Sequence, residues 1–245
     1  MSRKCRVRAA VSIAAVIVCC GFGARVASGE DGRERERFVF FSGVDLWRQG
    51  NFAHGGMMWS PDGLDRDGFT FKAALAGGTY RYRSGALGGA QVTGREFGAQ
   101  ILPGWRFKRD TLEVKIFTGL EIREHHLTPD DPTARLRGHI TAMRWAVDLW
   151  YEPTAASMLA ADAAVSSAGA SYSARGALGW RVFGKAYVGP ETAAIVSDDY
   201  RQFRVGVHVT GFKANNFEWS AAAGWVSDSD HRTGAYGRIG VLTRR

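Results

Sequence analysis

Six histidines are the side chains with the most versatile chemistry in this sequence, because imidazole can act as a general base or as a metal ligand. They are His54, His125, His126, His139, His208 and His231. A hydrolytic Ser-His-acid site needs a hydroxyl beside an imidazole that a third group orients. No G-x-S-x-G string presents a serine in this way, and no hydroxyl stands out near a histidine. We therefore expect no catalytic residues and a protein that is not an enzyme.

The segment "EHHLTPDDPTA" (124–134) is the one place where possible metal ligands gather. We expect it to be a loop that carries Glu124, His125, His126, Asp130 and Asp131, which could bind a cation. Their spacing matches no strong metal signature, and surface loops are often this polar. We expect no metal site and no cofactor.

Charges of both signs recur on one side of several alternating stretches, together with glycine and alanine. Mixed charges can neutralise one another inside a narrow interior, as burial requires. This pattern favours a structural ion-pair network, and the alternative is a polar lining that hydrogen-bonds a sugar chain. We expect Arg204 and His208 to pair with Glu191 or Glu218. The predicted interior residues are Lys72, Glu113, Lys115, Glu121, Arg144, Asp148, Arg175, Arg181, Glu191, Arg204, His208 and Glu218.

The amino-terminal segment has the pattern of a secretory leader. A basic stretch is followed by the apolar run "AAVSIAAVIVCCGFGA" and by small residues before a cleavage position near Ser28. Cleavage would remove all three cysteines. It would also leave 27 basic against 24 acidic residues, so the formal net charge falls from +8 to +3. The mature chain then has neither a thiol site nor the basic excess that nucleic-acid binding requires.

After a flexible charged lead-in (29–37), the chain alternates between extended stretches and turns. We expect the stretch 154–168, which is rich in alanine, to be a strand and not a helix. The expected strands cover about 38–47, 52–59, 68–82, 91–107, 111–123, 136–151, 156–166, 171–183, 185–194, 201–213, 217–227 and 234–243. They predict an all-β fold, a single antiparallel transmembrane barrel of about twelve strands over residues 38–245.

The connections between these strands fall into two groups when alternate ones are assigned to the same rim. Short turns such as "KRD" and "KANN" share the rim of the termini, and longer ones such as "EHHLTPDDPTA" and "SDSDHRT" lie opposite. This arrangement is typical of outer-membrane barrels with short periplasmic turns and longer outer loops. The segment "SPDGLDRDG" (60–68) is the exception, because it is long on the short-turn rim.

The two faces of the strands suggest which side meets lipid. In 201–213, Phe203, Val205, Val207 and Val209 alternate with Arg204, Gly206, His208 and Thr210. A soluble periplasmic barrel would also alternate, but charges that share a face with small residues suit a narrow lumen. Large aromatics near the strand ends predict interfacial girdles, namely Trp47, Trp59, Trp105, Trp150, Tyr151 and Trp180.

Strings of residues over most of 38–245 resemble the cellulose biosynthesis protein BcsS family. The matching strings are "FSGVDLWRQG", "GLDRDGF", "YRYRSGALGG", "LPGWRFKRD", "VDLWYEPT", "SYSARGALGWRVF", "VGPE", "DDYRQFRVGVHVTGFK", "FEWSAAAGW" and "YGRIGVLTRR". The final "TRR" departs from the aromatic end that is usual in outer-membrane barrels, but it looks like a feature of this family.

The resemblance implies a non-enzymatic outer-membrane accessory of bacterial cellulose biosynthesis or export. Its expected partners are outer-membrane lipid and either the cellulose chain or components of the synthase complex, with no nucleic acid among them. The resemblance brings no catalytic residues. Two alternatives stay open, a small general porin or channel and an outer-membrane enzyme acting on lipid or glycan.

Overall fold

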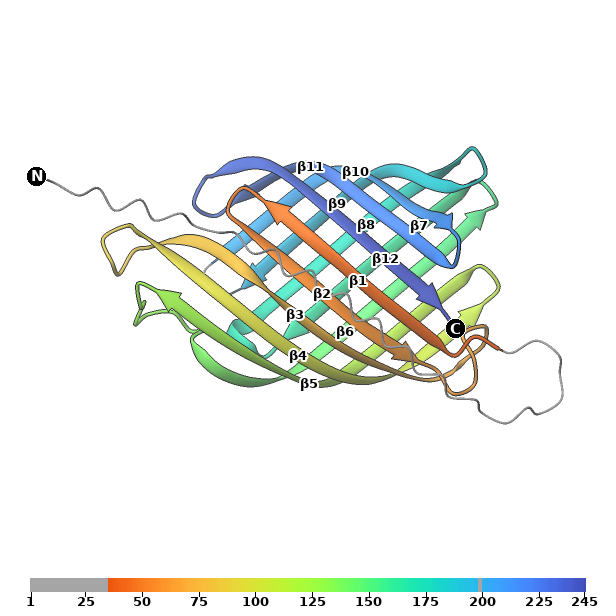
Figure 1. The fold of residues 1–245 in the computed structure, drawn as a ribbon, viewed down its shortest axis with the longest axis horizontal. Coiled ribbons are helices and arrows are strands. Elements are labelled where there is room, and N and C mark those ends of the chain that lie inside the picture. The colour runs from red at the N-terminus through yellow and green to blue at the C-terminus, as the bar shows by residue number, and fades with distance from the viewer. Residues whose placement is uncertain (1–34, 198–199) are drawn as a thin grey trace, which may run out of the picture. The chain divides into compact units, whose positions relative to one another are not determined.

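Twelve antiparallel strands form a closed barrel in the computed structural model, which describes residues 35–197 and 200–245 (Figure 1). Each strand pairs with its neighbours in the chain, and the last pairs with the first over Val39↔Arg244 to Trp47↔Tyr236. The predicted fold class is therefore confirmed. The strands are β1 Phe38–Trp47, β2 Gly50–Trp59, β3 Gly68–Ser84, β4 Ala90–Arg109, β5 Leu112–Thr128, β6 Gly138–Thr154, β7 Ser157–Ser166, β8 Ser171–Val182, β9 Ala186–Ser197, β10 Tyr200–Ala214, β11 Phe217–Asp228 and β12 Thr233–Arg244.

The alanine-rich stretch is a strand, as expected, and only one short 3-10 turn, Ala168–Ala170, follows it. The predicted leader (1–28) lies outside the described residues. In the described part of the chain, no helix combines the length and the apolar character needed to cross a membrane.

The segment 124–134 is not a loop at its beginning, which corrects the sequence prediction. β5 continues to Thr128, so Glu124, His125 and His126 are strand residues. The alternation simply continues past Arg123: the side chain of His125 is buried in the barrel, whereas that of His126 is exposed. The two histidines therefore point to opposite sides of the wall and cannot share a ligand.

The two rims differ as the sequence predicts. The turn rim carries the start of β1, the end of β12 and the connections 60–67, 110–111, 155–156, 183–185 and 215–216. The loop rim carries the connections 48–49, 85–89, 129–137, 167–170 and 229–232. The segment 60–67 is indeed the long connection on the turn rim.

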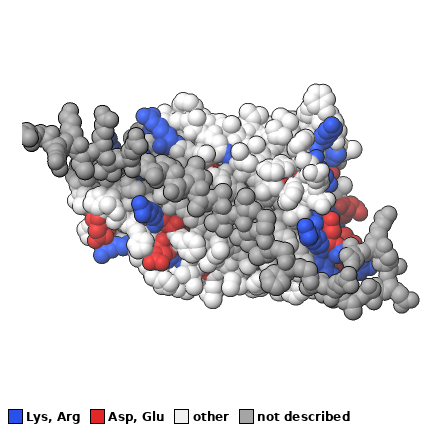
Figure 2. All heavy atoms as spheres, viewed as in Figure 1, with Lys and Arg blue, Asp and Glu red and all other residues white. Residues whose placement is uncertain are grey.

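The outer face of the barrel is apolar. Phe203, Val205 and Val207 of β10 are more than half exposed, and comparable side chains follow on the other strands. On the face drawn in Figure 2, outside the grey atoms, charged groups gather mainly toward the two ends. A wall with apolar side chains outside and charges at its ends has the distribution that a bilayer requires.

Apolar side chains from β1, β2, β4 and β5 pack together in the lumen beside the turn rim. Val39, Met58, Leu102 and Phe117 pack against one another and are almost completely buried. The connection 60–67 adds Leu64 to this cluster, which we call the turn-rim plug. The exceptional length of this connection therefore has a structural role, because it carries an apolar side chain into the end of the barrel.

Hydrogen bonds hold the connection 60–67 over the plug. Arg106 Nη1 donates to the Leu64 carbonyl oxygen at 2.6 Å, and Leu64 N donates to the Glu36 carbonyl oxygen at 2.9 Å. Asp67 accepts from Lys108 N at 2.6 Å and from Arg109 Nη1 at 2.5 Å. These hydrogen bonds hold the pKa of the Asp67 carboxyl below its ordinary value. Glu36, which the sequence places in the lead-in, thus contacts the barrel end.

Candidate functional site

The lumen beside the loop rim contains a cavity of about 480 Å³, which we call the vestibule. This volume lies in the range of about 300–1,000 Å³ that is typical of small-molecule sites. Its wall combines aromatic, amide, hydroxyl and charged side chains from strands all round the barrel. Polar and aromatic residues of this wall include Asp45, Trp47, Tyr80, Tyr82, Glu96, Gln100, Glu121, Arg123, Arg144, Ser171, Ser173, Ser197, Tyr200, Gln202 and Arg204.

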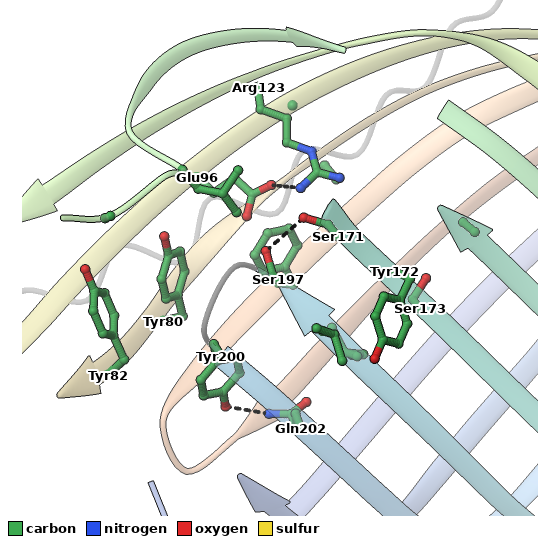
Figure 3. Close-up of a pocket in the computed structure, with 18 of the residues that line it drawn as sticks. Tyr80, Tyr82, Glu96, Arg123, Ser171, Tyr172, Ser173, Ser197, Tyr200 and Gln202 are labelled. Carbon is green, nitrogen blue, oxygen red and sulfur yellow. Dashed lines mark hydrogen bonds and ion pairs between the residues drawn. The ribbon is translucent and has the colours of Figure 1, made fainter. Parts of the chain in front are cut away.

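Two tyrosines of β3 form one side of the vestibule. The rings of Tyr80 and Tyr82 lie side by side, with centroids 6.2 Å apart and an interplanar angle of 23° (Figure 3). Both hydroxyls are anchored, since Tyr80 Oη lies 3.2 Å from His125 Nδ1 and Tyr82 Oη donates to Asp131 Oδ2 at 3.0 Å. The two rings are therefore fixed in orientation.

A second group of side chains comes from the beginning of β10. Gln202 Nε2 donates to Tyr200 Oη at 3.0 Å (Figure 3), and Gln202 Oε1 accepts from Arg204 Nε at 2.7 Å. Arg204 Nη1 in turn donates to Asp45 Oδ1 of β1 at 2.7 Å. The guanidinium lies over the rings of Trp47 and Tyr236, with its carbon 5.1 and 5.3 Å from the two centroids.

The floor of the vestibule is an ion-pair cluster around Glu121 of β5. The Glu121 carboxylate lies 3.0 Å from a guanidinium nitrogen of Arg123 and 3.0 Å from one of Arg144, and it accepts a short hydrogen bond from Ser166 Oγ. Arg123 also reaches Glu96 at 3.9 Å. Two guanidinium groups thus compensate two buried or half-buried carboxylates, as a low-dielectric site requires.

The connection 129–137 forms part of the vestibule entrance. Its Asp131 carboxylate is buried and accepts from Thr133 N at 3.1 Å, from Thr133 Oγ1 at 2.8 Å and from Tyr82. Hydrogen bonds from Ser84, Thr133 and Tyr82 hold the pKa of Asp131 at about 2, against an ordinary value of 3.8. Leu136 of the same connection packs on Ala142 and Ala168.

The predicted interior residues lie on the inner face of the wall, and most of them are in ion pairs. The pairs among them are Lys72–Asp148 at 3.2 Å, Lys115–Glu113 at 2.7 Å, Arg144–Glu121 at 3.0 Å and Arg175–Glu191 at 3.2 Å. Three more have other partners: Arg181 lies 3.7 Å from Glu152, Arg204 2.7 Å from Asp45, and Glu218 2.6 Å from Arg244. Only Glu121, Arg144 and Arg204 of this set line the vestibule.

The expected pairing of Arg204 and His208 with Glu191 or Glu218 is wrong. Arg204 binds Asp45, which lies three strands away, and His208 hydrogen-bonds Thr210 Oγ1 and the Leu178 carbonyl oxygen, each at 2.9 Å. Glu191 instead binds Arg238 at 2.5 Å and Arg175. An arginine side chain is long enough to reach past its neighbouring strands, and that of Arg204 passes over the ring of Tyr236 on β12, so strand adjacency does not determine its partner.

Two members of the predicted aromatic girdle point inward, which corrects that prediction. Trp47 lines the vestibule, and Trp150 packs on the buried residues Met158 and Tyr187. Both have the parity of the polar face of their strand: Trp47 follows Asp45, and Trp150 follows Asp148. The other predicted members, Trp59, Trp105, Tyr151 and Trp180, are exposed on the outer face.

The sequence interpretation missed the tyrosines, Glu96, Gln100 and Gln202. The string "TYRYRS" does carry a signal, because Tyr80 and Tyr82 share the parity of Lys72 and of Ser84, whereas Arg81 and Arg83 have the opposite parity. Residue type alone places aromatic side chains of a membrane barrel on the lipid side, and by that criterion Tyr80 and Tyr82 are not identified as lumen residues. Such aromatic side chains inside a lumen are typical of a wall that contacts a ligand or fills the barrel.

Comparisons with solved structures find other barrels at low sequence identity. The translocator domain of the autotransporter NalP from Neisseria meningitidis is 13% identical, with a TM-score of 0.49, 88% of this chain covered and 90% of that chain. The KdgM porin is 10% identical, with a TM-score of 0.46 and coverage of 84% and 98%. LpxR from Salmonella typhimurium is 11% identical, with a TM-score of 0.42 and coverage of 84% and 99%. A search of curated proteins gives no significant match.

The family comparison is far more specific. The model of the family described as cellulose biosynthesis protein BcsS matches residues 39–245, which is the whole barrel from the second residue of β1 to the carboxyl terminus. By this match, the chain belongs to the cellulose biosynthesis protein BcsS family.

Proposed function

We propose that this protein is a non-enzymatic outer-membrane accessory of bacterial cellulose biosynthesis or export. The observation that carries the proposal is the family match over the whole barrel. The apolar outer face supports the location, because a soluble barrel of this kind would expose those side chains to water. Its expected partners are outer-membrane lipid and either the cellulose chain or components of the synthase complex.

The surroundings of two inner-face histidines, His208 and His125, support a role without catalysis. The ring nitrogens of His208 contact Thr210 Oγ1 and a backbone carbonyl, and among the described residues no carboxylate hydrogen-bonds this ring. His125 Nδ1 contacts the phenol of Tyr80, and its Nε2 lies 3.8 Å from Glu96 Oε1, which is too long for a hydrogen bond. A nucleophilic hydroxyl with its base and an acidic third group would be needed for acyl transfer.

A general porin is less well supported than an accessory role. A channel needs a continuous polar path, whereas the turn-rim plug packs Val39, Met58, Leu102 and Phe117 together in the lumen. Wild-type protein in a planar bilayer is therefore expected to conduct far less than an open porin of similar strand number. Steady porin-like conductance would favour the channel function instead.

The test of the proposed function is a deletion of the gene in its own host. Cellulose yield and dye binding are expected to fall and to recover with the wild-type gene, and the protein is expected in the outer-membrane fraction. A second secreted polysaccharide, measured in the same cells, controls for general envelope damage. Unchanged cellulose together with a soluble periplasmic protein would contradict both parts of the proposal.

A further inference from the structure

We propose that the vestibule is a blind binding site for a neutral pyranose oligosaccharide, which enters from the loop rim. The identification of that sugar with cellulose rests on the proposed function, but the site itself is inferred from its own chemistry. Three properties of the wall point to this class of ligand: oriented aromatic rings, charges most of which are already paired, and apolar packing toward the turn rim.

The aromatic rings supply the first property. One face of a pyranose ring presents C–H groups, which are weakly positive, and the π face of an aromatic ring is weakly negative. Tyr80 and Tyr82 offer two neighbouring rings on one side of the vestibule (Figure 3), and Tyr200 stands on another side. The hydrogen bonds of Tyr80 to His125 and of Tyr82 to Asp131 fix these rings before a ligand arrives. A prearranged wall loses little conformational entropy on binding.

The paired charges supply the second property. Asp45 faces Arg204 at 2.7 Å, Glu121 faces Arg144 at 3.0 Å, and Glu96 faces Arg123 at 3.9 Å. An acidic oligosaccharide would need an excess of basic groups, which these pairs do not provide.

A neutral sugar instead needs many donors and acceptors close together. A guanidinium has five N–H donors, so an ion pair leaves donors for hydroxyl groups. Gln100 and the hydroxyls of Ser173 and Ser197 add further donors and acceptors to the wall.

The apolar packing toward the turn rim supplies the third property. Below the Glu121 cluster, Phe117 and Leu102 of the turn-rim plug are 1% exposed. A chain that enters the loop rim therefore meets packed side chains before it reaches the turn rim. The vestibule suits a chain end or a short segment, and the volume of about 480 Å³ sets the same limit.

The test is direct binding to the purified full-length barrel in detergent. Cellohexaose is titrated by calorimetry, with maltohexaose as a second neutral sugar and trigalacturonate as an acidic one. We expect saturable binding of a neutral sugar and at least about tenfold weaker binding of trigalacturonate. Trp47 lines the vestibule, so its fluorescence gives an independent signal.

Two substitutions on β3 form a matched pair. Ala76 lines the vestibule, so Ala76→Trp should fill it and abolish binding, whereas Ala73 has the opposite parity and Ala73→Trp should leave binding unchanged. Tyr82→Ala should weaken binding by about tenfold, and Tyr82→Phe, which keeps the ring, by less. If Ala76→Trp prevents folding, as judged by gel mobility without heating, the tyrosine pair still tests the site.

Each outcome decides the inference. Neutral-sugar binding that Ala76→Trp abolishes and Ala73→Trp preserves supports it. No binding of either neutral sugar at millimolar concentration, tighter binding of trigalacturonate, or equal binding by the two tryptophan variants overturns it. Binding of maltohexaose alone supports the vestibule as a neutral-sugar site and counts against the cellulose assignment. A cellulose defect on deletion without any sugar binding would leave the proposed function in place and remove this site.

Discussion

Arg106 lies at the turn-rim end of the lumen, so its replacement should affect that end and leave the vestibule unchanged. Its side chain is 2% exposed, and Nη1 donates to the Leu64 carbonyl oxygen at 2.6 Å, which ties the connection 60–67 to the wall. Its Nε lies 3.4 Å from Glu113 Oε1. We predict that Arg106→Met, which keeps much of the volume and removes the charge, destabilises the barrel and loosens this connection.

The expected magnitude follows from what remains after the substitution. Breaking a buried ion pair costs about 3–5 kcal/mol when it leaves a charge uncompensated. Glu113 retains Lys115 at 2.7 Å and Lys108 at 3.9 Å, so most of that penalty does not apply. The loss is then that of one charged hydrogen bond to a carbonyl group, about 1.5–3 kcal/mol in the free energy of unfolding.

The assay is urea unfolding in detergent, combined with limited trypsin digestion at Arg66 in the same connection. Lys108→Met is the matched control, because Lys108 is two residues further along β4 on the same face, its side chain makes the long 3.9 Å contact with Glu113, and its backbone hydrogen bond to Asp67 survives the substitution. This control should cost less than about 0.5 kcal/mol and leave Arg66 as protected as in the wild type. Equal unfolding energies and equal cleavage for the two variants would refute the role assigned to Arg106.

Three further predictions concern other parts of the barrel. The ionised Asp131 holds the connection 129–137. Because its folded-state pKa is low, this stabilisation is complete above pH 3.8 and is lost as the pH falls toward about 2. Proteolysis of the connection should therefore rise only below about pH 3, and Asp131→Asn should show that rise at pH 7. Glu121→Gln leaves two guanidinium groups undercompensated and should lower the free energy of unfolding by about 3 kcal/mol, against little change for the exposed Glu124→Gln. Phe183 has a positive φ of 51° in the turn before β9. Phe183→Asn should therefore raise the free energy of unfolding by about 0.5–1 kcal/mol. A lower free energy of unfolding in vesicles but not in detergent would instead indicate that Phe183 anchors the turn in the membrane interface.

The strand pattern and the polarity of the two faces could be predicted because both depend on local parity. A strand sends alternate side chains to opposite faces, so Val205 and Arg204 are separated whatever the rest of the chain does. Parity also explains why Trp47 and Trp150 do not belong to the predicted girdle. Both share the parity of neighbouring aspartates and therefore point inward. Residue type alone is misleading at these two positions, because it places tryptophan in a membrane barrel at the lipid interface.

The contacts across the lumen could not be predicted from the sequence. Arg204 and Asp45 are on β10 and β1, three strands apart in the closed barrel, and their contact depends on the curvature and tilt of the wall. Local pattern likewise cannot show where the connection 60–67 folds. Its length is exceptional for the turn rim, and the packing of Leu64 against the cluster of Met58 and Phe117 explains it.

The unequal filling of the lumen bears on whether this barrel conducts or holds its ligand. If a glucan chain displaced the turn-rim plug, Leu64 and the residues packed with it would have to leave the lumen, and Arg106 would have to release the Leu64 carbonyl group. Each step exposes apolar surface or leaves a buried polar group without a partner, and neither cost is recovered from a neutral sugar that brings no charge. The vestibule needs no such change, since its tyrosines and ion pairs are already in place. We therefore favour a barrel that holds a chain end at the loop rim over one that conducts the polymer.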